Sequence, residues 1–159
     1  ANQPPGVGQF SRGYGGGLMS EFMELYNGML RGIRAWSRWD EFQKTLAEQA
    51  DNGWYVYFVG VDLPQAPLDA VTFCKVLDAI GILLHHDHKE TYLGIVYVDD
   101  FEHPRLIKIY DPNHLGASCG SSGKVIPAGW VFSRVPPDPL GEFVVPEGRK
   151  RWWREIFQN

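Results

Sequence analysis

Hydrophobic residues recur every three or four positions in four segments of the chain, which is the spacing of an amphipathic helix. These segments are residues 18–36, 37–53, 67–81 and 146–157. The third helix either ends at Gly81 or continues through residues 82–86. The pattern therefore predicts three long helices and a short helix at the C-terminus.

The same pattern predicts where the helices begin and which of their residues point toward the core. Ser37 is expected to cap the second helix, and Pro67 and Asp69 belong to the first turn of the third. In the third helix, the residues expected to point inward are Val71, Cys74, Leu77 and Ile80. In the C-terminal helix, Trp152 with Ile156 and Trp153 with Phe157 form pairs four residues apart, so this helix is expected to dock on the core.

Four shorter segments have the composition of strands: residues 54–60, 92–98, 106–111 and 130–135. The second and third are joined by the short turn Phe-Glu-His-Pro, which favours antiparallel pairing. Two of the strands are apolar on both faces, so helices are expected to cover both sides of the sheet. The predicted fold is α+β, with a four-stranded, mainly antiparallel sheet.

Length and composition limit the number of domains and the classes of protein to which the chain can belong. The chain of 159 residues is long enough for one domain, which we expect over residues 18–159, after a flexible arm rich in Gly and Pro at residues 1–17. The formal net charge of −4 argues against a general nucleic-acid binder, and no apolar run is long enough for a membrane span. Two cysteines are too few for a disulfide scaffold, so both are expected to be reduced in a cytoplasmic protein.

The loop at residues 112–124 holds most of the chemically unusual residues. Asp111 and Asn113 flank a proline and favour a turn. The small residues that follow could turn backbone N–H groups toward an anion, and Lys124 adds a positive charge. The candidate ligand-binding residues are Asp111, Asn113, His114, Ser118, Cys119 and Lys124.

All five histidines lie between positions 85 and 114, namely His85, His86, His88, His103 and His114. Clustered imidazoles indicate a transition-metal site as one alternative, with His86, His88 and His114 as candidate ligands. The segment at 86–88 supplies at most two of them on one face, whether it is extended or helical. The other interpretation of this segment is a solvated connection between a helix and a strand.

The hairpin that ends in Asp111-Pro112-Asn113 resembles the end of papain-like cysteine hydrolases of the bacterial effector type. In that family the catalytic histidine begins the first strand of the hairpin and the aspartate lies in the turn. The resemblance implies a cysteine-dependent hydrolase with Cys119 or Cys74 as nucleophile, His86 or His88 as base and Asp111 as the residue that orients the base.

These observations leave three hypotheses for function. The leading one is a non-enzymatic binding or accessory domain without a cofactor. It would use the 112–124 loop and the adjacent histidine segment to contact a protein partner or a small anionic ligand. The cysteine hydrolase and the transition-metal-binding protein are the alternatives.

Overall fold

The computed structural model describes residues 19–115 and 126–158. The predicted arm at residues 1–17 lies outside the described residues. The same is true of Ser118, Cys119 and Lys124 of the predicted loop.

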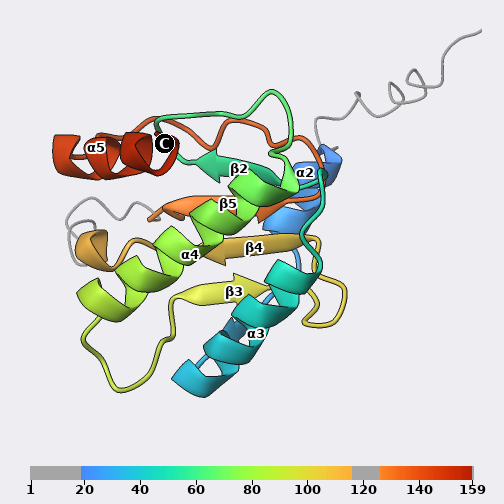
Figure 1. The fold of residues 1–159 in the computed structure, drawn as a ribbon. Coiled ribbons are helices and arrows are strands. Elements are labelled where there is room, and N and C mark those ends of the chain that lie inside the picture. The colour runs from blue at the N-terminus through green and yellow to red at the C-terminus, as the bar shows by residue number, and fades with distance from the viewer. Residues whose placement is uncertain (1–18, 116–125, 159) are drawn as a thin grey trace, which may run out of the picture.

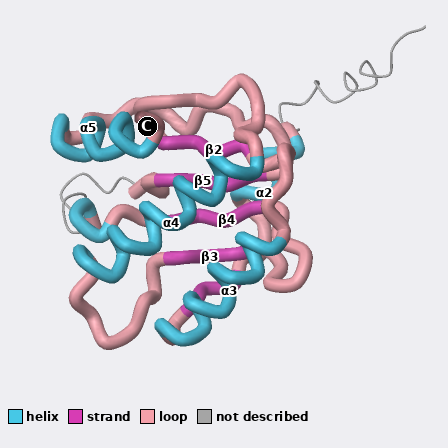
Figure 2. Tube along the Cα trace, viewed as in Figure 1, coloured by secondary structure: helices cyan, strands magenta, loops and turns pink. Residues whose placement is uncertain are grey.

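Five antiparallel strands form one sheet in the order β1-β3-β4-β5-β2 (Figures 1 and 2). The strands in the described part of the chain are β1 (Arg31–Ile33), β2 (Tyr55–Phe58), β3 (Val96–Val98), β4 (Leu106–Ile109) and β5 (Trp130–Ser133). The helices there are α2 (Glu21–Tyr26), α3 (Trp36–Glu48), α4 (Ala70–Asp87) and α5 (Glu147–Ile156), with a 3-10 turn, η2 (Pro112–His114), after β4. The predicted α+β class and the antiparallel pairing are confirmed.

Helices α3 and α4 cover one face of the sheet, as Figure 1 shows, and the main hydrophobic core lies beneath them. The fully buried aromatic residues of this core include Trp39, Trp54, Phe73, Trp130 and Phe132. On the opposite face, α2 packs against β4, and Phe22 lies with Tyr57 and Val131 in a second, smaller cluster. Both faces are therefore covered by apolar side chains, although the second face is covered less completely.

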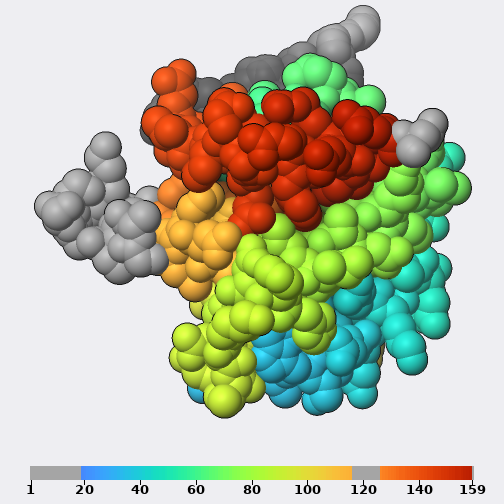
Figure 3. Space-filling view, turned by 60° about the vertical axis from the view of Figure 1, so that its left-hand side comes forward, coloured from blue at the N-terminus to red at the C-terminus, as the bar shows by residue number. Residues whose placement is uncertain are grey.

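Helix α5 docks on the core at the β2 edge of the sheet. Trp153 is buried, and its ring lies 5.0 Å from that of Phe58. In the space-filling view, α5 lies against α4, and the segment that follows β4 lies beside them (Figure 3). Trp152 and Ile156 also pack against the core, whereas Phe157, at the end of the helix, is 40% exposed. None of the helices in the described ranges combines the length and apolar character needed to cross a membrane.

The prediction of a four-stranded sheet is wrong because the first predicted helix, residues 18–36, ends early. The helix stops at Tyr26, and Asn27 caps it. A Cβ at position 28 would lie 2.9 Å from the carbonyl oxygen of Glu24, so Gly28 allows a close turn that another residue would not. The chain then turns to the sheet edge and forms the fifth strand, β1.

Strand β1 explains two residues that the helical spacing assigns to the first helix. Ile33 is buried opposite Val96 in the main core rather than on a helical stripe. Gly32 lies opposite Tyr97, and a Cβ there would come within 3.1 Å of the Tyr97 ring. The glycine therefore permits the tyrosine to lie across the edge strand.

Two further details of the helix predictions are also wrong. Helix α3 begins at Trp36 with Ala35 as its cap, so Ser37 is already inside the helix. Helix α4 begins at Ala70, after Pro67, and Asp69 caps it by accepting a hydrogen bond from the Thr72 N–H. It runs through Gly81 to Asp87, which is the longer of the two predicted extents.

The predicted inward face of α4 is shifted by one position at its start. Val71 is 74% exposed, whereas Val76 is fully buried. Phe73 is buried, and Cys74, which is expected inside from its spacing, is only half-buried. Leu77 and Ile80 are buried as predicted. This helix has apolar residues nearly all round, so spacing alone does not fix its rotation.

The rotation of α4 about its axis can be tested with the same substitution, Val to Ala, at two positions of the helix. Val76→Ala should lower the free energy of unfolding by about 2 kcal/mol, because it removes buried methyl groups and leaves a cavity. Val71→Ala should change it by less than about 0.5 kcal/mol, because the side chain is in water. Urea denaturation of both variants measures the difference, and equal losses would contradict this rotation of α4.

Candidate functional site

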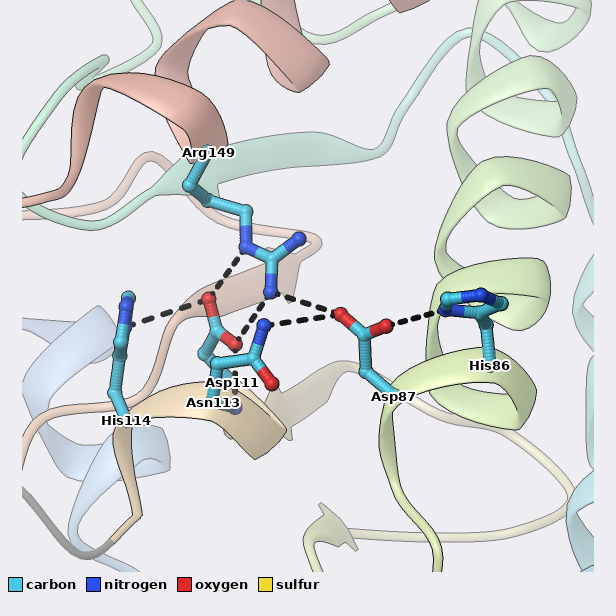
Figure 4. A network of polar contacts seen from close by, with 6 residues as sticks. All are labelled: His86, Asp87, Asp111, Asn113, His114 and Arg149. Carbon is cyan, nitrogen blue, oxygen red and sulfur yellow. Dashed lines mark hydrogen bonds and ion pairs between the residues drawn. The ribbon is translucent and has the colours of Figure 1, made fainter.

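Six polar residues form a cluster where α4, η2 and α5 meet (Figure 4). They are His86, Asp87, Asp111, Asn113, His114 and Arg149. Asp87 ends α4, Asp111 follows β4 and caps η2, and Arg149 lies in the first turn of α5. We call this set the Arg149 cluster.

Arg149 binds Asp111 through two parallel hydrogen bonds. Its Nε donates to Oδ2 at 2.8 Å, and its Nη2 donates to Oδ1 at 2.9 Å. Both side chains are nearly out of water, with exposed fractions of 11% and 5%. A bidentate pair of this kind fixes both position and orientation, so it holds the start of α5 against the end of β4.

Asp87 joins the same guanidinium from the other side. Its Oδ2 accepts from Arg149 Nη2 at 3.2 Å and from Asn113 Nδ2 at 3.0 Å. Its Oδ1 lies 2.6 Å from Nδ1 of His86. On the far side of the cluster, His114 Nδ1 lies 3.4 Å from Asp111 Oδ2. Each carboxylate therefore faces one histidine and the shared arginine.

The charged partners shift one another's protonation. Burial by itself raises the pKa of Asp87, but the hydrogen bonds from His86, Arg149 and Asn113 and the charge of Arg149 outweigh it, so the pKa lies below its ordinary value. Burial likewise lowers the pKa of Arg149, and the hydrogen bonds and charges of Asp111 and Asp87 more than compensate. The ion pairs thus keep Asp87 and Arg149 in their charged forms at neutral pH.

With neutral histidines, two carboxylates and one guanidinium leave the cluster with one net negative charge. Such a cluster attracts cations and disfavours a further anion. Asp111 and Asn113, two of the predicted ligand-binding residues, are engaged inside it. The arrangement is suited to holding three segments together rather than to receiving an anionic ligand.

The other predicted site residues are distributed differently. His88 is buried, with its Nε2 2.7 Å from the carbonyl oxygen of Leu93, and His85 stacks on Trp36. The structure pairs Asp111 with His114 rather than with His86 or His88. Cys74 lies twelve residues before His86 on the same helix, which corresponds to about 18 Å of helical rise, so the structure does not bring these two together.

The metal candidates do not converge within the described ranges. No group of three or more His, Cys, Asp or Glu side chains there is arranged to hold a metal ion. His86 and His114 lie on opposite sides of the Arg149 cluster, with the guanidinium between the two carboxylates (Figure 4).

A separate pocket of about 350 Å³ opens beside the loop, on the sheet face opposite α3 and α4. Its walls are Leu30, Gly94, Ile95, Tyr97, Lys108, Tyr110, Leu115 and Ile126. Leu115 and Ile126 are the residues on either side of segment 116–125. The predicted loop therefore departs from and returns to the rim of this pocket, which we call the Tyr97 pocket.

Lys108 is the one charged residue among these described lining residues. It is half-buried, and its Nζ lies 3.7 Å from the ring centroid of Tyr26, at the end of α2. No carboxylate of the described residues lies within 4.0 Å of this nitrogen. Burial lowers the pKa of Lys108, as expected for an ammonium group without a carboxylate partner.

The aromatic walls of the pocket are formed by Tyr97 and Tyr110. Their rings lie 5.9 Å apart, edge to face. Burial, with Tyr26 and Tyr97 nearby, raises the pKa of Tyr110 to about 12. Its hydroxyl is therefore neutral at physiological pH and able to donate a hydrogen bond.

Sequence reasoning did not identify the Tyr97 pocket. The available signal was Lys108, a charged residue within the apolar segment Leu106–Ile109. Burying a charge in a strand with two covered faces is costly, so a lysine there indicates a special environment. Arg149 stands out in the sequence only as part of a basic stretch, because its carboxylate partners are 38 and 62 residues away.

Comparison of the chain with protein-family models, with curated proteins and with solved structures gave no match. Its function is therefore inferred from the geometry of the site.

Removing the guanidinium of the Arg149 cluster should destabilise the fold. Arg149→Met leaves two largely buried carboxylates without their cation, so we expect a loss of about 3–5 kcal/mol in the free energy of unfolding. Arg151→Met, an exposed change on the same helix, should cost less than about 0.5 kcal/mol. Urea denaturation compares them, and similar losses for both would show that the cluster does not hold α5 in place.

Because of the same cluster, the free energy of unfolding should decrease as the pH falls below about 5. Because the folded pKa of Asp87 is below its unfolded value of about 3.9, its contribution is present above that pH and is lost as the pH falls. Asp87→Asn should therefore reduce the decline in unfolding free energy between about pH 5 and pH 3. Asp78→Asn, an exposed change on α4, serves as the control, and an unchanged slope in Asp87→Asn would refute the assignment.

Proposed function

We propose that this chain is a non-enzymatic binding or accessory domain that holds a small anionic ligand in the Tyr97 pocket. The observation that carries the proposal is the half-buried Lys108, which lines the pocket and has no carboxylate partner among the described residues; its Nζ lies over the ring of Tyr26. A pocket of about 350 Å³ is within the usual size range of small-molecule sites.

The position of the pocket supports the same function. Its rim carries Leu115 and Ile126, so the loop with the unusual composition begins and ends at the ligand site. The Arg149 cluster fixes η2, immediately before Leu115, against α4 and α5. In this proposal the cluster is the frame of the site, and Lys108 supplies the charge that attracts the ligand.

A mixture of small organic anions, screened by NMR, tests this proposal. We expect a subset to shift the backbone amide signals of Gly94, Tyr97 and Lys108. Leu30→Trp should abolish these shifts, because Leu30 lines the pocket and the larger side chain fills it. Met29→Trp is the matched control, since Met29 is 91% exposed and is not among the lining residues.

Two outcomes would contradict the proposal. One is the absence of any anion whose effect is confined to the pocket residues. The other is an equal effect of the two tryptophan substitutions, which would place the binding elsewhere on the surface.

The cysteine hydrolase is a second candidate because of the Asp111–His114 pair. An aspartate within 3.4 Å of a histidine nitrogen can orient that histidine as a base. Iodoacetamide labelling tests this candidate. If both thiols react at the rate of an ordinary exposed thiol across the pH range, the hydrolase is excluded; a thiol that reacts faster near neutral pH and is slowed by His114→Gln supports it.

A further inference from the structure

The walls of the Tyr97 pocket restrict the kind of anion that it accepts. Apart from Lys108, the described residues that line it have apolar or aromatic side chains, or in the case of Gly94 none. An inorganic anion would lose its hydration there and gain one charged partner among the described lining residues, which is an unfavourable exchange. A ligand with an apolar body can replace the water on those walls, so the body contributes to binding as well as the charge.

The tyrosines favour a flat body. Tyr97 is an exposed aromatic residue, with 36% of its surface accessible, and its ring stands at 82° to that of Tyr110. The two rings are already in edge-to-face contact at 5.9 Å, so a planar ring packs against the exposed part of the Tyr97 ring rather than between the two, in one of the preferred arrangements of aromatic pairs. A branched or spherical body of equal volume makes fewer such contacts.

Lys108, the one cation among the described lining residues, sets the charge of the ligand. One ammonium balances one negative charge, and the lining residues of the described chain provide no second cation. A dianion such as a phosphate monoester would leave a charge uncompensated beside apolar walls. A monoanionic carboxylate matches the charge, and a neutral tyrosine hydroxyl at the pocket wall is a suitable additional donor.

We propose that the ligand of the Tyr97 pocket is a small aromatic carboxylate, with its carboxylate paired to Lys108 and its ring packed against the aromatic wall that Tyr97 and Tyr110 form. This inference rests on the proposed function, because it names the ligand class for the same site.

Four probes of known composition separate the contributions of ring and charge: benzoate, benzyl alcohol, acetate and inorganic phosphate. Binding to the intact chain is followed by NMR through the amide signals of the pocket residues. Benzoate should bind at least about tenfold more tightly than benzyl alcohol, because both oxygens can accept a hydrogen bond from Lys108 but only the carboxylate adds an opposite charge. It should also bind more tightly than acetate, which lacks the ring.

Substitutions of Lys108 test the role of the charge. Lys108→Met should remove the preference for benzoate over benzyl alcohol, while Lys108→Arg should retain most of it. Lys75→Met, at an exposed lysine on α4, should leave the preference unchanged. The comparison of probes on the unsubstituted protein remains decisive even if a variant at position 108 does not fold.

The outcomes distinguish this inference from the proposed function. If phosphate or acetate occupies the pocket and benzoate does not, the ligand class is wrong and the anion-binding function stands. Equal affinity for benzoate and benzyl alcohol would also reject the carboxylate. If none of the anions perturbs the pocket, and the wider screen also finds none, the proposed function fails as well.

Discussion

The turn at Asn27 and Gly28 takes the chain from the second face of the sheet to its edge. Two features of this structure depend on it, the fifth strand and the Tyr97 pocket. If the helix continued to residue 36, as its spacing predicts, residues 31–33 would be helical and could not form β1. Instead the helix ends after six residues, and the chain turns to the edge to form β1. The fifth strand and the Tyr97 pocket both result from this turn, because Leu30 and Tyr97 then form part of a concave wall.

The Arg149 cluster plays a complementary part at the other end of β4. It joins segments that are far apart in sequence by a guanidinium that two carboxylates share. Buried ion pairs of this kind contribute little net stability compared with apolar packing, but they define one arrangement because an unpaired member is costly. Here they fix where η2 begins, and with it the rim of the pocket at Leu115.

The fold class could be predicted from the sequence because most elements carry local signals. The turn Phe-Glu-His-Pro set the antiparallel pairing, and the spacing of Trp39, Phe42 and Leu46 set the buried face of α3. The prediction of the first helix was right for Phe22 and Leu25, which lie in α2, and wrong beyond Tyr26, because Met29 and Ile33 continue the helical spacing by coincidence. Ile33 is buried through strand pairing, a contact with Val96 that no local pattern contains.

The candidate site was predictable only in outline. The loop after β4 was identified from its composition, and Leu115 places its start at the pocket. The partners of Asp111 were not predictable, since Arg149 arrives from a helix 38 residues later. Lys108 stands out in the sequence only as a charged residue in an apolar strand, and the structure adds that no carboxylate of the described residues pairs with it.

The protonation of Lys108 provides the most direct test of the proposed site. Burial lowers its pKa in the free protein, so a bound carboxylate should raise it toward or above its ordinary value of about 10.4. The pKa can be followed by NMR of the side-chain carbon next to the amine, with benzoate or with neutral benzyl alcohol at saturating concentration. We expect a rise with benzoate and none with the alcohol. A pKa of Lys108 that stays the same in the presence of bound benzoate would contradict the pairing of the ligand with this lysine.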